Sequence, residues 1–168
     1  MDQSSVVTIS PVTPENIISF HQALDMVSRE RRYLTFLEAP PLDRFREFVT
    51  TMIADGNPQY VALADQRVVG WCDIRRHFHA AHAHRGTLGM GIIASYRGQG
   101  LGIRLIDAAM KQARKAGFVR IELGVHADNE RAIALYEKVG FIREGVARDA
   151  VFIDGRYVDT VNMAVVYR

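Results

Sequence analysis

The spacing of apolar residues divides the chain into helical segments and β-branched or alternating runs. Apolar residues recur at helical spacing in four segments, which predicts helices over 14–28, 41–55 and 101–117 and a shorter helix from Asp128 or Asn129 to Val139. Runs rich in β-branched and aromatic residues predict strands over 6–10, 59–64, 67–77, 88–94, 119–126, 141–152 and 157–167. Asp65-Gln66 and Asp154-Gly155 predict tight turns between strands.

These elements follow one another in the order β-α-α-β-β-β-α-β-α-β-β. Antiparallel hairpins are expected at the front and back, with one strand–helix–strand crossover between them. The 168 residues show no repeat and no linker. The pattern therefore predicts one domain over residues 1–168, of the α+β (mixed α/β) class, built on a single sheet.

Composition and charge narrow the class of protein further. The chain is 48% hydrophobic and 24% charged, its net charge is +2, and no block of five Lys or Arg occurs, so neither a nucleic-acid nor a membrane partner is expected. No apolar stretch approaches about 18 residues, and the first residues lack the features of a signal peptide. The single cysteine, Cys72, excludes an internal disulfide. A cytoplasmic protein is expected.

A glycine-rich turn before the third helix carries the first chemical signal. Gly98, Gly100 and Gly102 stand at alternate positions, so several backbone N–H groups can face one bound group beside a helix N-terminus. Arg97 supplies a cation next to them. The dinucleotide fingerprint does not fit, because its third glycine falls on Leu105, and no Gly-Lys-Ser/Thr sequence marks a P-loop. The turn predicts a phosphate or pyrophosphate site.

Two blocks of residues resemble a known family. The sequence from Arg97 to Gly102 resembles the Arg-x-x-Gly-x-Gly signature of the GNAT superfamily of acetyl-CoA-dependent N-acetyltransferases. The second block of that family follows in order as Asn129, Ala132, Leu135-Tyr136 and Gly140-Phe141, after the strand motif Glu122-Leu-x-Val125. The tail 154–164 and the block from His84 to Met90 are similar to a bacterial branch that acetylates amino acids, small amines or protein N-termini.

The resemblance implies a GNAT-like domain that uses acetyl-CoA as co-substrate. In such enzymes the mixed sheet is splayed between the fourth and fifth strands, here 88–94 and 119–126, and the freed backbone groups pair with the pantetheine arm. A strand amide near 90–92 is expected to stabilise the oxyanion. Asn129 is expected to cap its helix, to contact the arm, or both. The implied coenzyme A contacts are Ile92, Ile93, Ala94, Arg97, Gly98, Gln99, Gly100, Leu101, Gly102, Ile103, Asn129, Ala132 and Tyr136.

The resemblance also implies catalytic roles. Tyr136 is the expected general acid for the departing thiolate; the alternative is a core tyrosine. Relatives often carry an acidic residue where this chain has Thr87, so the identity of the general base is left open. Glu122 is the named candidate, with Asp73, His84 or a chain of waters as alternatives. Direct attack by the amine is expected, because Cys72 has no evident activating partner.

The identity of the acetyl acceptor is the least determined part of the predicted function. In this fold the segment 32–38 lines the acceptor pocket, so Tyr33, Phe36 and Glu38, together with His84, are the candidate contacts; helix packing is the alternative for the first three. The histidines at 77, 79, 82 and 84 are interpreted as a solvated loop and not as a metal site.

The expected acceptor is an amino acid or other small amine in a ternary complex. A protein N-terminus or lysine is the alternative within the class. A coenzyme A-binding regulatory module is the alternative outside it. The C-terminal hairpin is the candidate surface for a homodimer.

Overall fold

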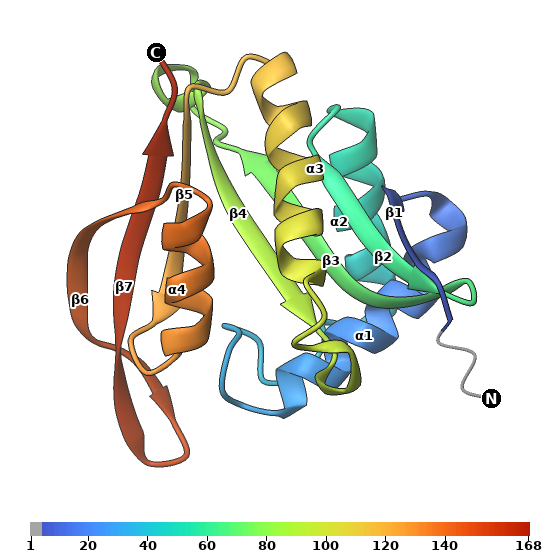
Figure 1. The fold of residues 1–168 in the computed structure, drawn as a ribbon, viewed down its shortest axis with the longest axis horizontal. Helices are drawn as coiled ribbons and strands as arrows, with labels where there is room; N and C mark the ends of the chain where they lie inside the picture. The colour runs from blue at the N-terminus through green and yellow to red at the C-terminus, as the bar shows by residue number, and fades with distance from the viewer. Residues whose placement is uncertain (1–4) are drawn as a thin grey trace.

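The computed structural model describes residues 5–168, so the first four residues of the predicted domain lie outside the described part. Seven strands form one mixed sheet in the order β1-β2-β3-β4-β5-β7-β6 (Figure 1). The strands are β1 (Val7–Pro11), β2 (Gln59–Ala64), β3 (Arg67–Arg76), β4 (Arg85–Ile92), β5 (Arg120–His126), β6 (Ile142–Ile153) and β7 (Arg156–Val166). The helices are α1 (Ile17–Arg29), α2 (Leu42–Ala54), α3 (Leu101–Lys115) and α4 (Glu130–Lys138), with three 3-10 turns at Pro14–Asn16, Ala80–His82 and Ala94–Tyr96.

The predicted order of strands and helices is confirmed, and the boundaries differ by a few residues. A difference of three residues is found at β4, which begins at Arg85 and not at residue 88. Its first residues are polar and break the apolar pattern used to find the strand. Arg85 is held in the sheet because its charge is paired with that of Glu122 on β5.

The helices cover the sheet in two layers. Figure 1 shows α3 and α4 in front of the sheet and α1 and α2 behind it. Behind the sheet, Phe20 of α1 packs against Phe45 of α2 and Trp71 of β3, with ring centroids 4.9 and 5.6 Å away. In front, α3 buries Leu105 and Ala109 completely. The sheet therefore has an apolar core on both faces of its central strands.

The sheet opens between β4 and β5, as the resemblance implied. The two parallel strands pair only over Arg85–Thr87 and Arg120–Glu122, and Figure 1 shows them diverging from that end. At the closed end, Gly86 lets β4 approach the ring of Phe118, because a Cβ there would lie 2.5 Å from that ring. The opening leaves backbone groups of both strands without a strand partner.

Within residues 5–168, no helix combines the length and the apolar character needed to cross a membrane. Cys72 is buried and free.

Candidate active site

The glycine-rich turn presents a row of free amides at the start of α3. Gly98 and Gly100 have φ of +77° and +78°, a conformation in which a side chain is strained. None of the six amides from Gly98 to Ile103 donates a backbone hydrogen bond to another described residue. They lie at the positive end of a 15-residue helix. This cradle fits a pyrophosphate group.

Arg97 does not leave its charge free for this turn. Its guanidinium donates to Glu30 at 2.9 and 2.5 Å and to the carbonyl of Ile92 at 2.8 Å. It also lies over the ring of Tyr33, 4.9 Å from the centroid. The hydrogen bonds to Glu30 raise the pKa of Arg97 further, so the guanidinium stays charged and neutralised by its partner.

Arg131 is the cation that lies over the turn. Its Nη2 lies 2.9 Å from the position that a Cβ on Gly98 would take, and it forms no ion pair within residues 5–168. The sequence interpretation missed this residue. A signal was present, because an arginine in the first turn of a helix is unfavourable unless an anion is nearby.

The backbone of β4 supplies groups that face the opening. His77 N–H bonds Arg85 O and Ile93 N–H bonds Val69 O, so the odd-numbered residues of β4 are bonded to β3. The amides and carbonyls of Leu88, Met90 and Ile92 therefore face the gap. Of the predicted arm contacts, the Ile92 carbonyl already accepts from Arg97, the Ile93 amide is used by β3, and Ala94 begins a 3-10 turn.

Helix α4 borders the opening on the front face. Asn129 caps it, because its side-chain oxygen accepts from the amide of Ala132 at 3.2 Å. Tyr136 is 8% exposed and packs against Phe141, with ring centroids 5.8 Å apart. Burial, with a smaller effect of nearby Cys72, raises the pKa of the Tyr136 phenol, so it stays protonated at neutral pH. Its hydroxyl forms no hydrogen bond to a described residue, which leaves the proton available.

Glu122, the predicted base, lies at the closed end and is held by arginines. Arg85 and Arg120 donate to its carboxylate at 2.7 and 2.6 Å. Burial alone would raise the pKa of Glu122, but these two partners outweigh it and the pKa is lowered. His77 lies 3.4 Å from the same carboxylate. This environment stabilises the charged form and makes Glu122 a weak proton acceptor.

Asp73 has the opposite environment. It lies on β3 directly across from Gly89, and its Oδ1 is 3.5 Å from the position of a Cβ on Gly89. It shares the rear face of the sheet with Trp71. Burial raises the pKa of Asp73 to about 7, with a smaller opposing effect of Arg75. On the other side Asp73 pairs with Gln59, whose buried Oε1 accepts no hydrogen bond from a described residue.

The predicted acceptor residues do not gather at one place. His84 is exposed at the closed end, where its carbonyl accepts from Val119 and Arg120. In the loop between α1 and α2, Phe36 is 50% exposed and Glu38 lies 3.4 Å from Arg29. Tyr33 lies beneath Arg97, next to the opening.

That loop is fastened to the C-terminal hairpin. Arg31 forms an ion pair with Asp154 at 2.8 Å, and a nitrogen of the His126 ring lies 2.8 Å from the carbonyl oxygen of Arg32. The loop therefore closes the open end of the splay from below, as Figure 1 shows.

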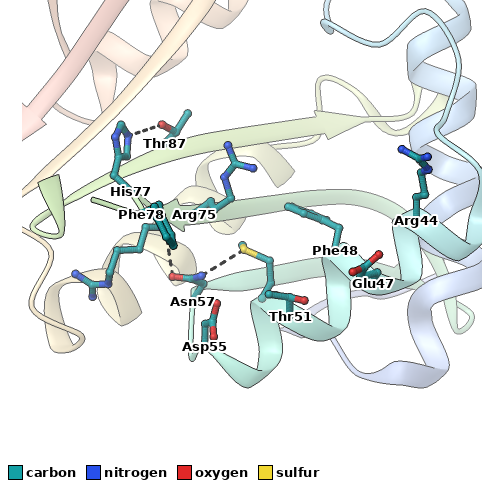
Figure 2. Close-up of a pocket in the computed structure, with 12 residues that line it drawn as sticks. Arg44, Glu47, Phe48, Thr51, Asp55, Asn57, Arg75, His77, Phe78 and Thr87 are labelled. Atoms are coloured by element: carbon teal, nitrogen blue, oxygen red, sulfur yellow. Dashed lines mark hydrogen bonds between the residues drawn. The ribbon is translucent and has the colours of Figure 1, made fainter. Parts of the chain in front are cut away.

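A groove of about 1010 Å³ lies between α2 and the strands β3 and β4 (Figure 2). Toward Asp73 its floor ends at the pair Arg75 and Thr87, which is two pairs away from the pair Asp73 and Gly89 along β3 and β4. None of the predicted acceptor residues lines it. The lining residues are Arg44, Glu47, Phe48, Thr51, Met52, Asp55, Asn57, Arg75, Arg76, His77, Phe78 and Thr87.

The histidines after β3 are spread out. The ring of His82 lies 6.2 Å from that of His77 and 6.3 Å from that of His79, measured between centroids. Within residues 5–168, no group of three or more His, Cys, Asp or Glu side chains is arranged to hold a metal.

Comparison with known proteins places these features in a family. The pattern of the acetyltransferase (GNAT) family matches residues 22–141. The chain is 34% identical over 85 residues to N-alpha-acetyltransferase 30 of Schizosaccharomyces pombe, covering 50% of this chain and 57% of that protein. It is 32% identical over 110 residues to the L-amino acid N-acetyltransferase AaaT of Escherichia coli, covering 65% of this chain and 68% of that protein.

The fold also matches a solved structure. A GNAT superfamily phosphinothricin acetyltransferase from Sinorhizobium meliloti, in complex with acetyl-CoA, superposes with a TM-score of 0.90 over 96% of this chain and 88% of that chain. The sequence identity is 19%, so this likeness concerns the fold.

Proposed function

The chain belongs to the acetyltransferase (GNAT) family and is an acetyl-CoA-dependent N-acetyltransferase, and we propose that its acceptor is an amino acid or other small amine. One arrangement carries the proposal: the sheet opens beside the glycine turn, Tyr136 lies on α4 at the front of the opening, and Asp73 lies on the rear face, one strand away across β4. A thioester held in the gap between β4 and β5 would then lie between a proton donor and a proton acceptor.

The cradle around Gly98 fits the pyrophosphate of coenzyme A. The free amides from Gly98 to Ile103 would hold its oxygens, and Arg131 would supply the charge. The backbone groups of Leu88 and Met90 would pair with the pantetheine arm, and the Met90 amide would stabilise the oxyanion. Acetyl-CoA supplies the acetyl group as a thioester.

Asp73 is the base that this arrangement favours over Glu122 and His84. A carboxylate with a pKa of about 7 takes a proton from an α-ammonium (about 8) far more readily than an ordinary aspartate (about 3.9). The neutral amine then attacks the thioester carbon, the new C–N bond forms, and the C–S bond breaks. The attacking nitrogen loses its second proton to solvent, Tyr136 donates its proton to the leaving thiolate and regains one from solvent, and Asp73 releases the proton it took.

The similarity to AaaT supports an amino acid acceptor, because that relative is an L-amino acid N-acetyltransferase. The similarity to N-alpha-acetyltransferase 30 supports a protein N-terminus as a second candidate. A thiol-release assay over amino acids, polyamines, antibiotics and peptides tests both. Turnover of free amines supports the first proposal, and turnover of peptides alone supports the second.

The homodimer stays a proposal. Strand β6 forms one edge of the sheet, and its hairpin with β7 exposes Ile142, Val146, Phe152 and Tyr157 by 57 to 71%. Sedimentation of the wild type and of a Phe152→Ser variant tests whether these side chains hold two copies together.

A further inference from the structure

The groove behind the sheet has two arginines without partners. Arg44 of α2 and Arg75 of β3 line it, and neither forms an ion pair within residues 5–168. In Figure 2, Arg75 projects from the strand between Thr87 on one side and Phe48 on the other. On the α2 wall, Phe48 supplies an apolar surface between the polar side chains of Glu47 and Thr51. The groove therefore combines a cationic group on its floor with a mixed wall that is apolar around Phe48.

Asp73 stands next to Arg75 without contacting it. The two residues are separated by one position on β3, so their side chains share the rear face and their Cα atoms are roughly 6.6 Å apart. They form no ion pair within 4 Å, although the charge of Arg75 acts on the Asp73 carboxyl. Two opposite charges side by side but not in contact can bind a ligand that carries both complementary charges close together.

We propose that the groove binds a free α-amino acid with a large apolar side chain. The amino group lies at Asp73, just beyond the end of the groove floor, the carboxylate lies at Arg75, and the side chain extends along the groove against Phe48. This inference rests on the proposed function and names the acceptor of the same site. A polyamine would leave Arg75 without an anion, and a peptide would offer it a neutral amide.

Matched amines test the role of the carboxylate. Phenylalanine, phenylalaninamide and phenethylamine each carry a primary amino group and the same ring, and only the first has a carboxylate. For the wild type, kcat/KM for phenylalanine should exceed that for the other two by about tenfold to a hundredfold, the range of a charge-assisted hydrogen bond.

Variants of Arg75 test whether this residue binds the carboxylate of the amino acid. Arg75→Gln should lower kcat/KM for phenylalanine alone, so that the ratio of kcat/KM for phenylalanine to that for phenethylamine falls close to one. Arg75→Lys should retain part of this preference for phenylalanine. Arg46→Gln is the control, because Arg46 is an exposed arginine of α2 that does not line the groove. An unchanged acetyl-CoA affinity of each variant shows that it is folded.

The outcomes separate this inference from the proposed function. Equal use of phenylalanine and phenethylamine by the wild type, or an unchanged preference in Arg75→Gln, overturns the inference and leaves acetyl transfer to small amines standing. Use of polyamines to the exclusion of amino acids does the same. If no free amine is acetylated, the proposed function itself fails.

Discussion

Arg97 and Glu30 form a two-contact ion pair that joins the residue before the glycine turn to the end of α1. The pair takes up the charge expected to meet the pyrophosphate. It also places Glu30 beside the opening, where it holds Arg97 against Tyr33 and the carbonyl of Ile92. The uncompensated charge at the turn is therefore that of Arg131, which comes from the opposite side of the opening.

This distribution of charge predicts that Arg131→Gln weakens acetyl-CoA binding more than Arg97→Gln does. Loss of a charge-assisted contact to the pyrophosphate should raise Kd by about tenfold to thirtyfold. Isothermal titration of acetyl-CoA measures it. Arg143→Gln is a control, because Arg143 is exposed on β6 and pairs only with Glu137. A larger loss for Arg97→Gln would show that the pair with Glu30 opens when the ligand binds.

Tyr136→Phe should lower kcat by about tenfold to a few hundredfold, because the thiolate leaves without a proton donor. The affinity for acetyl-CoA should not change, since only the hydroxyl is removed from a buried ring. Single-turnover rates and a binding isotherm separate the two effects. Tyr157→Phe, in the exposed hairpin, is the matched control. An unchanged kcat for Tyr136→Phe would contradict the assignment.

Gly91→Ala should destabilise the protein by about 1–3 kcal/mol. A Cβ on Gly91 would lie 2.6 Å from Cζ2 of Trp71, and that ring is fixed against Phe20. Gly145→Ala is the control, because its Cβ would meet nothing within 4 Å. Urea unfolding compares the two variants. Equal stability of both would show that Trp71 can move aside at little cost.

Most of the fold and the glycine turn could be predicted from the sequence because their signals are local. The turn residues Asp65 and Asp154 have positive φ, as the hairpin prediction requires, and Gly140 has φ of +104° after α4. Helical periodicity predicted α3 and α4 because it is also a local signal.

The environments of the catalytic candidates could not be predicted, because they depend on which strands lie side by side. Glu122 and Asp73 are both acidic residues in predicted strands. Only the pairing shows that arginines of β4 and β5 surround Glu122, whereas Gln59 and Gly89 flank Asp73. The groove was missed for a similar reason, since residues of α2 and β3 far apart in the chain form it.

The pKa of Asp73 predicts how the acetylation rate depends on pH. Below pH 7 the carboxyl is protonated and cannot accept a proton, so kcat/KM should fall about tenfold per pH unit there. The residues paired directly with it, Gln59 and Gly89, carry no charge, and Arg75 is the charged group that opposes the shift. Asp73→Asn should lower kcat and remove this dependence. If the fall in kcat/KM below pH 7 persists in Asp73→Asn, another group is the general base.

Asp73→Asn should also stabilise the fold at high pH, a readout independent of acetyl transfer. The pKa of Asp73 is about 7 when folded and about 3.9 when unfolded, so the folded state binds the proton more tightly. Its contribution to stability is complete below pH 4 and is lost as the pH rises through 7. Removing the ionisable group should therefore raise the free energy of unfolding at both pH values, by on the order of 4 kcal/mol at pH 8 and about 1.5 kcal/mol at pH 5. Chemical denaturation of both proteins at the two pH values measures the difference.

Asp107→Asn, at an exposed position of α3, is the control. Equal stability changes at pH 5 and pH 8 would mean that the carboxyl is ionised throughout, and Asp73 would then lose its advantage over Glu122 as the base.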